Sequence, residues 1–391
     1  MRFWQNSFEF CFYLVLSLHF IQDFKCLNLL SFLIYTLEYL GEIMATHTLK
    51  YFKQTVQNIF VKNDDALHDT GVTTENQLKA HLIESNFDKQ FPKIPEFPEW
   101  RLLDDTKNWY YTEKNEFGEI KSLFLDTSRE RVWILYSLIN AKELDTIVSK
   151  WSESSGKLDK CWLSRNQLLS FEKLTGWEEK GIGLKFNDVL ANDDFKSSFS
   201  LKAWYTPQTA DIGLKNVLEK ARESYAIDSI RWQKKEGGST KIASEWYSHG
   251  KITINRAEDI DDVMLSISMM ADKYEDSLLE ATKLRDSKMN AFEFNFSKDI
   301  DLNAFSEYVS KGRTQMNLWL AEVESHDDFK RFRGVDLHTW DPIFLDIGLN
   351  YAYLTVPGKG CVNAAPRIAT IQGQETAGKT NIYFDGVEIF D

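Results

Sequence analysis

The sequence predicts an α+β fold in which repeated β-α-β-β-β units form curved antiparallel sheets with helices packed on one face, after a helical N-terminal region. Two observations support this class. From about residue 108, short segments alternate apolar and polar residues between turn signals, which is typical of antiparallel strands. The order strand, helix and then several strands also recurs three times, in residues 108–196, 197–288 and 289–391.

The composition is that of a folded protein with a large core. Of the 391 residues, 43% are hydrophobic and 14% aromatic, which is enough apolar material for two or three modest domains. The formal net charge of -13 repels polyanions at long range and disfavours nonspecific nucleic-acid binding. The four cysteines are too widely spaced for a zinc motif or a disulfide framework, which favours a cytoplasmic location and buried, structural roles for Cys161 and Cys361.

The first 43 residues differ from the rest of the chain because they contain two uncharged apolar runs, residues 10–22 and 26–37. Each run is shorter than the about 20 residues that cross a bilayer, and no small-residue cleavage site follows the first. Met44 then opens a polar segment that leads into an amphipathic helix. We therefore expect residues 1–43 to be an apolar extension upstream of a true start at Met44, and no membrane contact outside this segment.

Residues 44–90 are predicted to be helical. The helix that follows Met44 is succeeded by residues 73–86, where a threonine cap precedes leucines at helical spacing. Three of the seven prolines then occur in residues 91–100, which rules out a helix or a central strand there. We expect residues 91–107 to be an extended connector and a domain boundary.

The three later units follow the same order. In the first, residues 131–139 form a strand, residues 140–151 a helix with Asn140 and Glu143 as its capping pair, and residues 160–164 a strand. The second and third units place strands at 199–205, 229–235, 291–297 and 316–323, helices at 214–225, 258–284 and 302–312, and a C-terminal hairpin after residue 380. The strand tryptophans are expected to be mostly core: Trp162, Trp204, Trp232, Trp246 and Trp319.

The stretch GQETAGKT, residues 373–380, matches the written pattern of a phosphate-binding P-loop. A P-loop needs a helix directly after its lysine, because the helix N-terminal amides hold the phosphates. Here the following residues alternate like a strand, and Asp385 with Gly386 predicts a type I′ hairpin turn. We therefore expect no nucleotide, and no cofactor is predicted.

Three other groups of residues are candidates for chemistry or binding. Asp336 and His338, with Asp341 shortly after, have the oxygen and nitrogen atoms of a metal site, which is the basis of an alternative function as a metal-dependent hydrolase or nuclease. The glycine-flanked loop of residues 358–367 presents Lys359, Asn363 and Arg367 to a ligand or partner, or else is a surface turn with Arg367 in an exposed ion pair. A cysteine nucleophile at Cys361 with His338 as its base is a weaker alternative.

The third group is the strand of residues 329–334, which interleaves Lys330, Arg331 and Arg333 with phenylalanines. This mixture suits phosphates and stacked bases, so a nucleic-acid-binding sheet surface is the second alternative, although an ordinary strand with solvated charges has the same pattern. Because no catalytic motif keeps its required structural context, we expect a binding or assembly protein that acts through protein–protein contacts or self-association.

Overall fold

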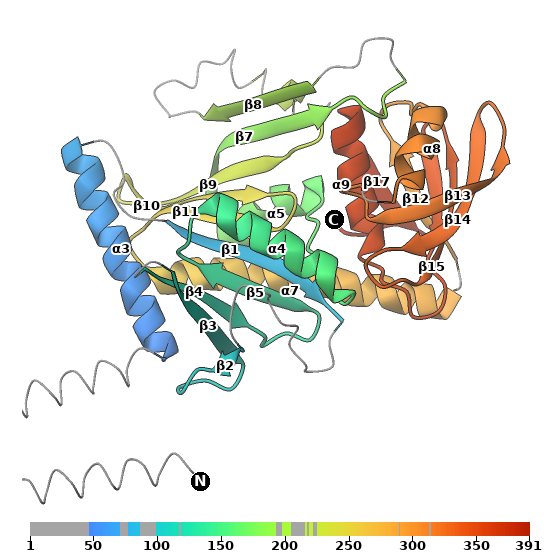
Figure 1. Cartoon of the computed structure of the whole chain (residues 1–391). Helices are drawn as coiled ribbons and strands as arrows, with labels where there is room; N and C mark the ends of the chain where they lie inside the picture. The colour runs from blue at the N-terminus through green and yellow to red at the C-terminus, as the bar shows by residue number, and fades with distance from the viewer. Residues whose placement is uncertain are drawn as a thin grey trace, which may run out of the picture.

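A computed structural model shows an α+β protein built on two antiparallel sheets of eleven and seven strands (Figure 1). The structure describes residues 47–70, 77–86, 99–116, 119–192, 198–204, 225–288, 290–312 and 314–391, with residues 216 and 219–221. The predicted α+β class, with antiparallel sheets and an N-terminal helix, is therefore confirmed.

The large sheet is formed by the N-terminal two thirds of the chain. Its strands run in the order β2-β3-β4-β5-β1-β11-β10-β9-β7-β8, and β6 pairs separately with β1. Their bounds are β1 Leu78–Ser85, β2 Arg101–Leu102, β3 Trp109–Glu116, β4 Glu119–Asp126, β5 Val132–Ser137, β6 Leu158–Lys160, β7 Glu178–Asn187, β8 Ser198–Trp204, β9 Ser229–Glu236, β10 Ser239–Tyr247 and β11 Lys251–Ala257.

The small sheet lies entirely in the C-terminal part of the chain. Its strands run in the order β13-β14-β15-β16-β12-β17-β18. Their bounds are β12 Phe292–Phe296, β13 Leu318–Ser325, β14 Phe329–Asp336, β15 Pro342–Gly348, β16 Tyr351–Thr355, β17 Thr380–Phe384 and β18 Val387–Glu388.

Helices cover one face of the small sheet, as predicted, but both faces of the large sheet, which corrects the prediction of one covered face. The apolar residues of α4 pack on one face of β1, β4 and β5, while α3, α5 and α7 pack on the opposite face. Helix α9 lies between the two sheets, against β7 on one side and β12 and β17 on the other, and α8 covers β13. The bounds are α3 Leu49–Thr70, α4 Ala141–Ser155, α5 Arg165–Thr175, α7 Ile260–Lys288, α8 Leu302–Ser310 and α9 Ala364–Thr376.

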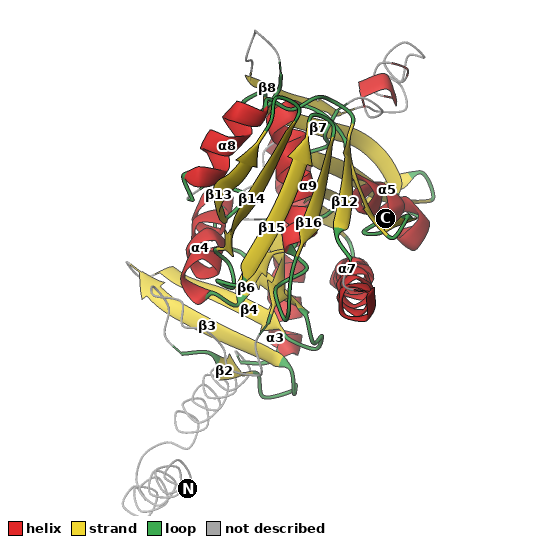
Figure 2. Cartoon of the chain, turned by 90° about the vertical axis from the view of Figure 1, so that its right-hand side faces the viewer, coloured by secondary structure: helices red, strands yellow, loops and turns green. Residues whose placement is uncertain are grey.

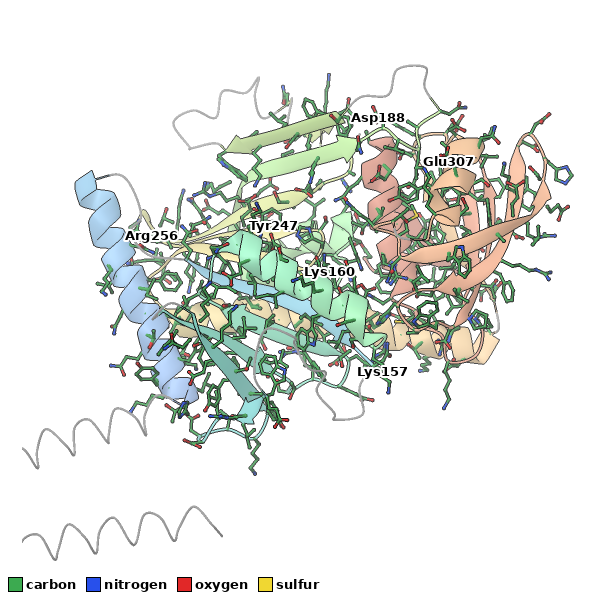
Figure 3. All side chains as sticks on the ribbon, in the orientation of Figure 1. Lys157, Lys160, Asp188, Tyr247, Arg256 and Glu307 are labelled. Atoms are coloured by element: carbon green, nitrogen blue, oxygen red, sulfur yellow. The ribbon has the colours of Figure 1, made fainter. Side chains whose placement is uncertain are left out.

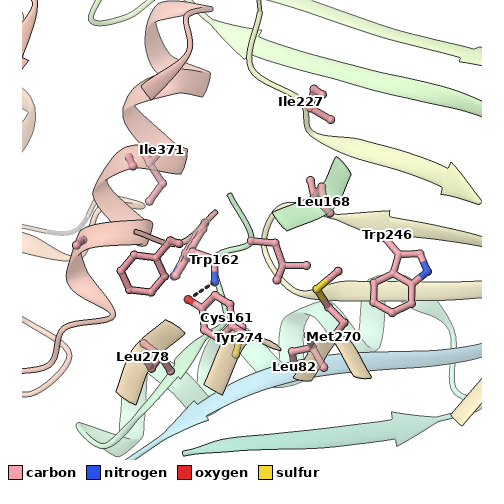
Figure 4. Packing of buried hydrophobic residues seen from close by; sticks show 14 of the residues in the cluster. Leu82, Cys161, Trp162, Leu168, Ile227, Trp246, Met270, Tyr274, Leu278 and Ile371 are labelled. Carbon is pink, nitrogen blue, oxygen red and sulfur yellow. Dashed lines mark hydrogen bonds between the residues drawn. The ribbon is translucent and has the colours of Figure 1, made fainter. Parts of the chain in front are cut away.

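One hydrophobic core joins the two sheets through α7 and α9. Figure 4 shows part of it, where the backbone N–H of Trp162 donates to the hydroxyl of Tyr274 at 2.9 Å, with Cys161 beside them. Both described cysteines are buried free thiols, as expected. Of the five strand tryptophans, Trp204 and Trp319 are exposed by 38% and 58%, and the other three are core residues.

Most of the predicted elements are present, but the strand predicted over residues 160–164 is β6, which ends at Lys160, and the helix α5 that follows it was not predicted. The capping contact of α4 is confirmed, because Asn140 Oδ1 accepts a hydrogen bond from the Glu143 amide at 2.9 Å. The helix predicted over residues 73–86 is wrong: residues 78–85 form β1, which pairs with β5, β6 and β11. All eight residues of β1 are buried, and a strand covered on both faces loses the alternation that identifies strands in a sequence.

Several predictions lie outside the described residues. These are the apolar extension and Met44, residues 91–98 of the proline-rich connector and most of the helix over residues 214–225. Among the helices that are described, none is long and apolar enough to cross a bilayer.

Candidate functional site

The P-loop pattern does not form a phosphate cradle. Helix α9 precedes the glycine and lysine, and the chain continues beyond Lys379 as β17, which pairs with β12 and β18. Asp385 and Gly386 have positive φ angles of 54° and 76°, as the predicted type I′ turn requires. The order helix, turn, strand is the reverse of a P-loop, and the Lys379 amide donates instead to Ser297 Oγ at 2.6 Å.

The segment predicted as an exposed loop is instead the start of a buried helix. Arg367 lies in the first turns of α9 and is only 1% exposed, so the expectation of a surface ion pair is wrong. Its Nε donates to the Met316 carbonyl at 2.8 Å, Nη1 donates to Asp159, and Nη2 donates to Asp336 Oδ1 at 2.5 Å. Arg367 therefore connects the large sheet to the end of β14.

Asn363, at the start of α9, extends this buried polar cluster. Its amide donates to Asp159 Oδ2 at 2.9 Å and to the Lys160 carbonyl at 3.0 Å, while its oxygen accepts from the Tyr274 hydroxyl. Burial alone would raise the pKa of Asp159, but the adjacent Arg367 guanidinium lowers it below its ordinary value. Asp159 is therefore held as a charged acceptor between two elements.

A second part of the cluster contains Glu84, His338 and Cys361. Each offers one atom that could bind a metal, and these three atoms all lie within 4.8 Å of one another. His338 Nε2 is 3.8 Å from Glu84 Oε2, and Cys361 Sγ is 3.5 Å from Glu84 Oε1. His338 is held in place by its backbone amide, which donates to Asp336 Oδ1 at 3.0 Å. The structure thus brings His338 and Cys361 together in the interior.

The predicted metal set of Asp336, His338 and Asp341 is arranged differently. Asp336 is the last residue of β14, and its carboxylate accepts a hydrogen bond from Arg367. The backbone carbonyl of Asp341 accepts a hydrogen bond from the Asp336 amide at 3.0 Å. Among the described residues, the group that could hold a metal contains His338 but neither aspartate. Sequence reasoning missed Glu84, because it lies in the segment that was predicted to be a helix and not a buried strand.

The basic strand is largely neutralised by carboxylates. Lys330 is buried and its Nζ lies 2.8 Å from Glu322, whereas Arg331 pairs with both Asp346 and Glu324. Arg333 is exposed and lies over the Phe344 ring, with 5.8 Å between its Cζ and the ring centroid. Lys359 lies at the tip of the exposed turn before α9.

A cleft of about 910 Å³ opens between α4, α9 and the turn that follows β14. Asp159 and Arg367 reach it from the buried cluster, and Lys160, which lies beside α4 (Figure 3), donates to Ser149 Oγ at 3.0 Å. Burial lowers the pKa of His249 in the same cleft to about 3, so this imidazole is neutral at physiological pH. The cleft is polar and mixed in charge.

The outer face of the small sheet is the other candidate surface. Figure 2 looks onto this sheet, with α8 and α9 behind it. The side chains that alternate with its buried residues are large and exposed: Trp319 by 58%, Phe344 by 37% and Tyr353 by 43%, accompanied by Arg331 and Arg333. We call these five residues, with Glu293 and Asp346, the outer sheet face.

Comparison with individual curated proteins gives no match. Residues 43–377 match the protein family described as MJECL33-like protein, and this range covers most of the chain. The protein therefore belongs to the MJECL33-like family.

Proposed function

We propose that this protein is an assembly protein that self-associates through the outer sheet face. The observation that supports this proposal is the set of exposed aromatic residues on a sheet face that no described helix covers. Trp, Tyr and Arg are enriched at the centres of protein interfaces, and a contiguous exposed aromatic patch is unfavourable in water unless it is buried by a partner.

The charges on this face favour a second copy of the chain as the partner. A two-fold axis that runs along the strands between β15 and β16 places β14 of one copy opposite β12 of the other. Because Arg331 and Glu293 lie on the same rung of the sheet, this arrangement sets Arg331 of one copy against Glu293 of the other. The contact is self-complementary in charge.

The size of the face is compatible with a specific dimer. Without the two-residue strand β18, the six remaining strands, at about 4.8 Å spacing and about 20 Å length, give roughly 600 Å² of flat area. A standard interface buries about 800 Å² per partner, and side-chain relief makes the accessible area larger than the flat area.

The test is the molar mass in solution, measured by light scattering after size exclusion over a range of concentrations. Wild type should be a dimer at micromolar concentration, and Trp319→Ser should shift the protein toward monomer. Arg331→Glu and Glu293→Arg should each weaken the dimer, whereas the double variant should regain it, because the two charges that face each other have exchanged places.

Leu265→Ser is the matched control, since Leu265 is 59% exposed but lies on α7, away from the outer sheet face. It should leave the dimer intact. A wild-type protein that stays monomeric at about 100 μM, a concentration far above the Kd of a specific dimer, would refute the proposal.

The metal-dependent enzyme remains the second candidate function. It is favoured by one observation, the buried group that contains His338. A hydrolase also needs a substrate-accessible metal, so hydrolysis of a model phosphodiester that is lost in His338→Asn and abolished by a chelator would favour this candidate.

A further inference from the structure

The strongest unexplained feature of the interior is a set of buried polar atoms without partners. In the described part of the chain, both ring nitrogens of His338 and Oε2 of Glu84 make no hydrogen bond, although both residues are at most 1% exposed. A buried polar atom without a partner costs about 1–3 kcal/mol. Three such atoms in one place therefore need an explanation.

We propose that Glu84, His338 and Cys361 form a binding site for a divalent transition-metal ion of the zinc class. A bound ion would accept a lone pair from one ring nitrogen of His338 and from Oε2 of Glu84, which are two of the three atoms without hydrogen-bond partners. The thiol of Cys361 supplies the third ligand from the segment before α9.

The distances fit such an ion after small adjustments. Zinc binds thiolate at about 2.3 Å and imidazole or carboxylate at about 2.0–2.2 Å, so tetrahedral geometry separates the ligand atoms by roughly 3.4–3.6 Å. Nε2 of His338 and Oε2 of Glu84 are already 3.8 Å apart, and Sγ of Cys361 lies within 4.8 Å of both residues' ligand atoms. Rotamer adjustments of less than about 1.5 Å would complete the contacts.

The surroundings favour this site in two ways. The ligands carry two negative charges, one on the thiolate and one on the carboxylate, which equal the charge of a divalent ion. Neighbouring groups also orient the ligands, because Arg131 Nη2 donates to Glu84 Oε1 and Asn86 Nδ2 lies 3.5 Å from Cys361 Sγ. Thiolate and imidazole select zinc, cobalt or nickel over magnesium and calcium.

The three ligands come from distant parts of the chain. Glu84 lies on β1 of the large sheet, His338 follows β14 of the small sheet, and Cys361 precedes α9. An ion at this point would therefore cross-link the two sheets. A fourth coordination position remains for a small ligand such as water.

The test is titration of the metal-free, full-length protein with Co²⁺. Wild type should bind about one equivalent and show a thiolate-to-cobalt charge-transfer band in the near ultraviolet, with visible bands of four-coordinate cobalt. Cys361→Ser should abolish the charge-transfer band, and His338→Asn should weaken Co²⁺ binding at least tenfold. Cys161→Ser is the matched control, since Cys161 is an equally buried free thiol outside the three-ligand group, and it should keep the band.

X-ray absorption at the zinc edge of the wild-type protein tests the proposal even if the variants fail to fold. We expect one sulfur at about 2.3 Å and the remaining ligands at about 2.0–2.1 Å. The proposal is refuted if wild type shows no charge-transfer band, if the band survives Cys361→Ser, or if zinc has no sulfur neighbour. Because the outer sheet face lies elsewhere, a negative result here would leave the dimer measurement unaffected.

Discussion

Replacement of Arg367 by methionine tests whether the buried ion cluster holds the two sheets together. Methionine fills a similar volume but removes the three donated hydrogen bonds, and it leaves the carboxylates of Asp159 and Asp336 buried beside no guanidinium. Removing one partner of a buried ion pair typically lowers the free energy of unfolding by about 3–5 kcal/mol. Asp159 keeps the Asn363 amide and Asp336 keeps the His338 amide, so we expect a loss near the lower end, about 3 kcal/mol.

The loss should depend on pH in a defined direction. In wild type the pKa of Asp159 lies below its ordinary value, so the stability that this carboxylate contributes is present above about pH 4 and is lost as the pH falls through its folded pKa. Without Arg367, desolvation raises the folded pKa of Asp159, and its protonation at acidic pH relieves the penalty. The difference between Arg367→Met and wild type should therefore be smaller at pH 4 than at pH 7.

The assay is urea unfolding followed by tryptophan fluorescence at both pH values. Arg101→Met is the matched control, because the same change is made at an exposed arginine on the edge strand β2, and its midpoint should stay close to that of wild type. Adding Asp336→Asn to Arg367→Met should recover part of the loss. A decrease of less than about 1 kcal/mol for Arg367→Met at pH 7, no larger than that of a typical surface change, would refute the reasoning.

Two further perturbations concern single residues on α9 and in the β10–β11 turn. Burial raises the pKa of Glu375 to about 7, against about 4.5 in the unfolded chain, so the unfolded chain releases its proton first and stability falls between pH 4.5 and 7. The unfolding free energy of Glu375→Gln should equal that of wild type near pH 4 and exceed it by about 1–2 kcal/mol at pH 8, after allowance for partial solvation. Equal unfolding free energies at pH 8 would contradict this. Gly250 has a positive φ of +76°, and a Cβ added there would lie 2.7 Å from the Cys161 carbonyl oxygen. Gly237 also has a positive φ, of +57°, but a Cβ added there would meet nothing within 4 Å. Gly250→Ala should therefore lower the melting temperature more than Gly237→Ala. Equal shifts in a thermal melt would show that the clash is relieved at no cost.

The amino-acid sequence by itself determined the local elements whose periodicity is unambiguous. The antiparallel strands of the small sheet alternate because one of their faces meets the core and the other faces water, so their pattern is visible without coordinates. The hairpin after Lys379 was likewise predictable, because Asp385 and Gly386 adopt positive φ angles at little cost. That local reasoning also excluded the P-loop.

Only the tertiary structure decided where the chemistry gathers. Glu84 lies on β1, a strand that is covered on both faces. Because both faces are buried, the sequence of β1 lacks the alternation of apolar and polar residues that would have identified a strand. Arg367 looked like a surface residue because an isolated arginine is strongly hydrated, and its burial is tolerable only because Asp159 and Asp336 reach it from different elements. Glu84 and Cys361 are separated by 277 residues, and such long-range convergence depends on packing that no local sequence pattern encodes.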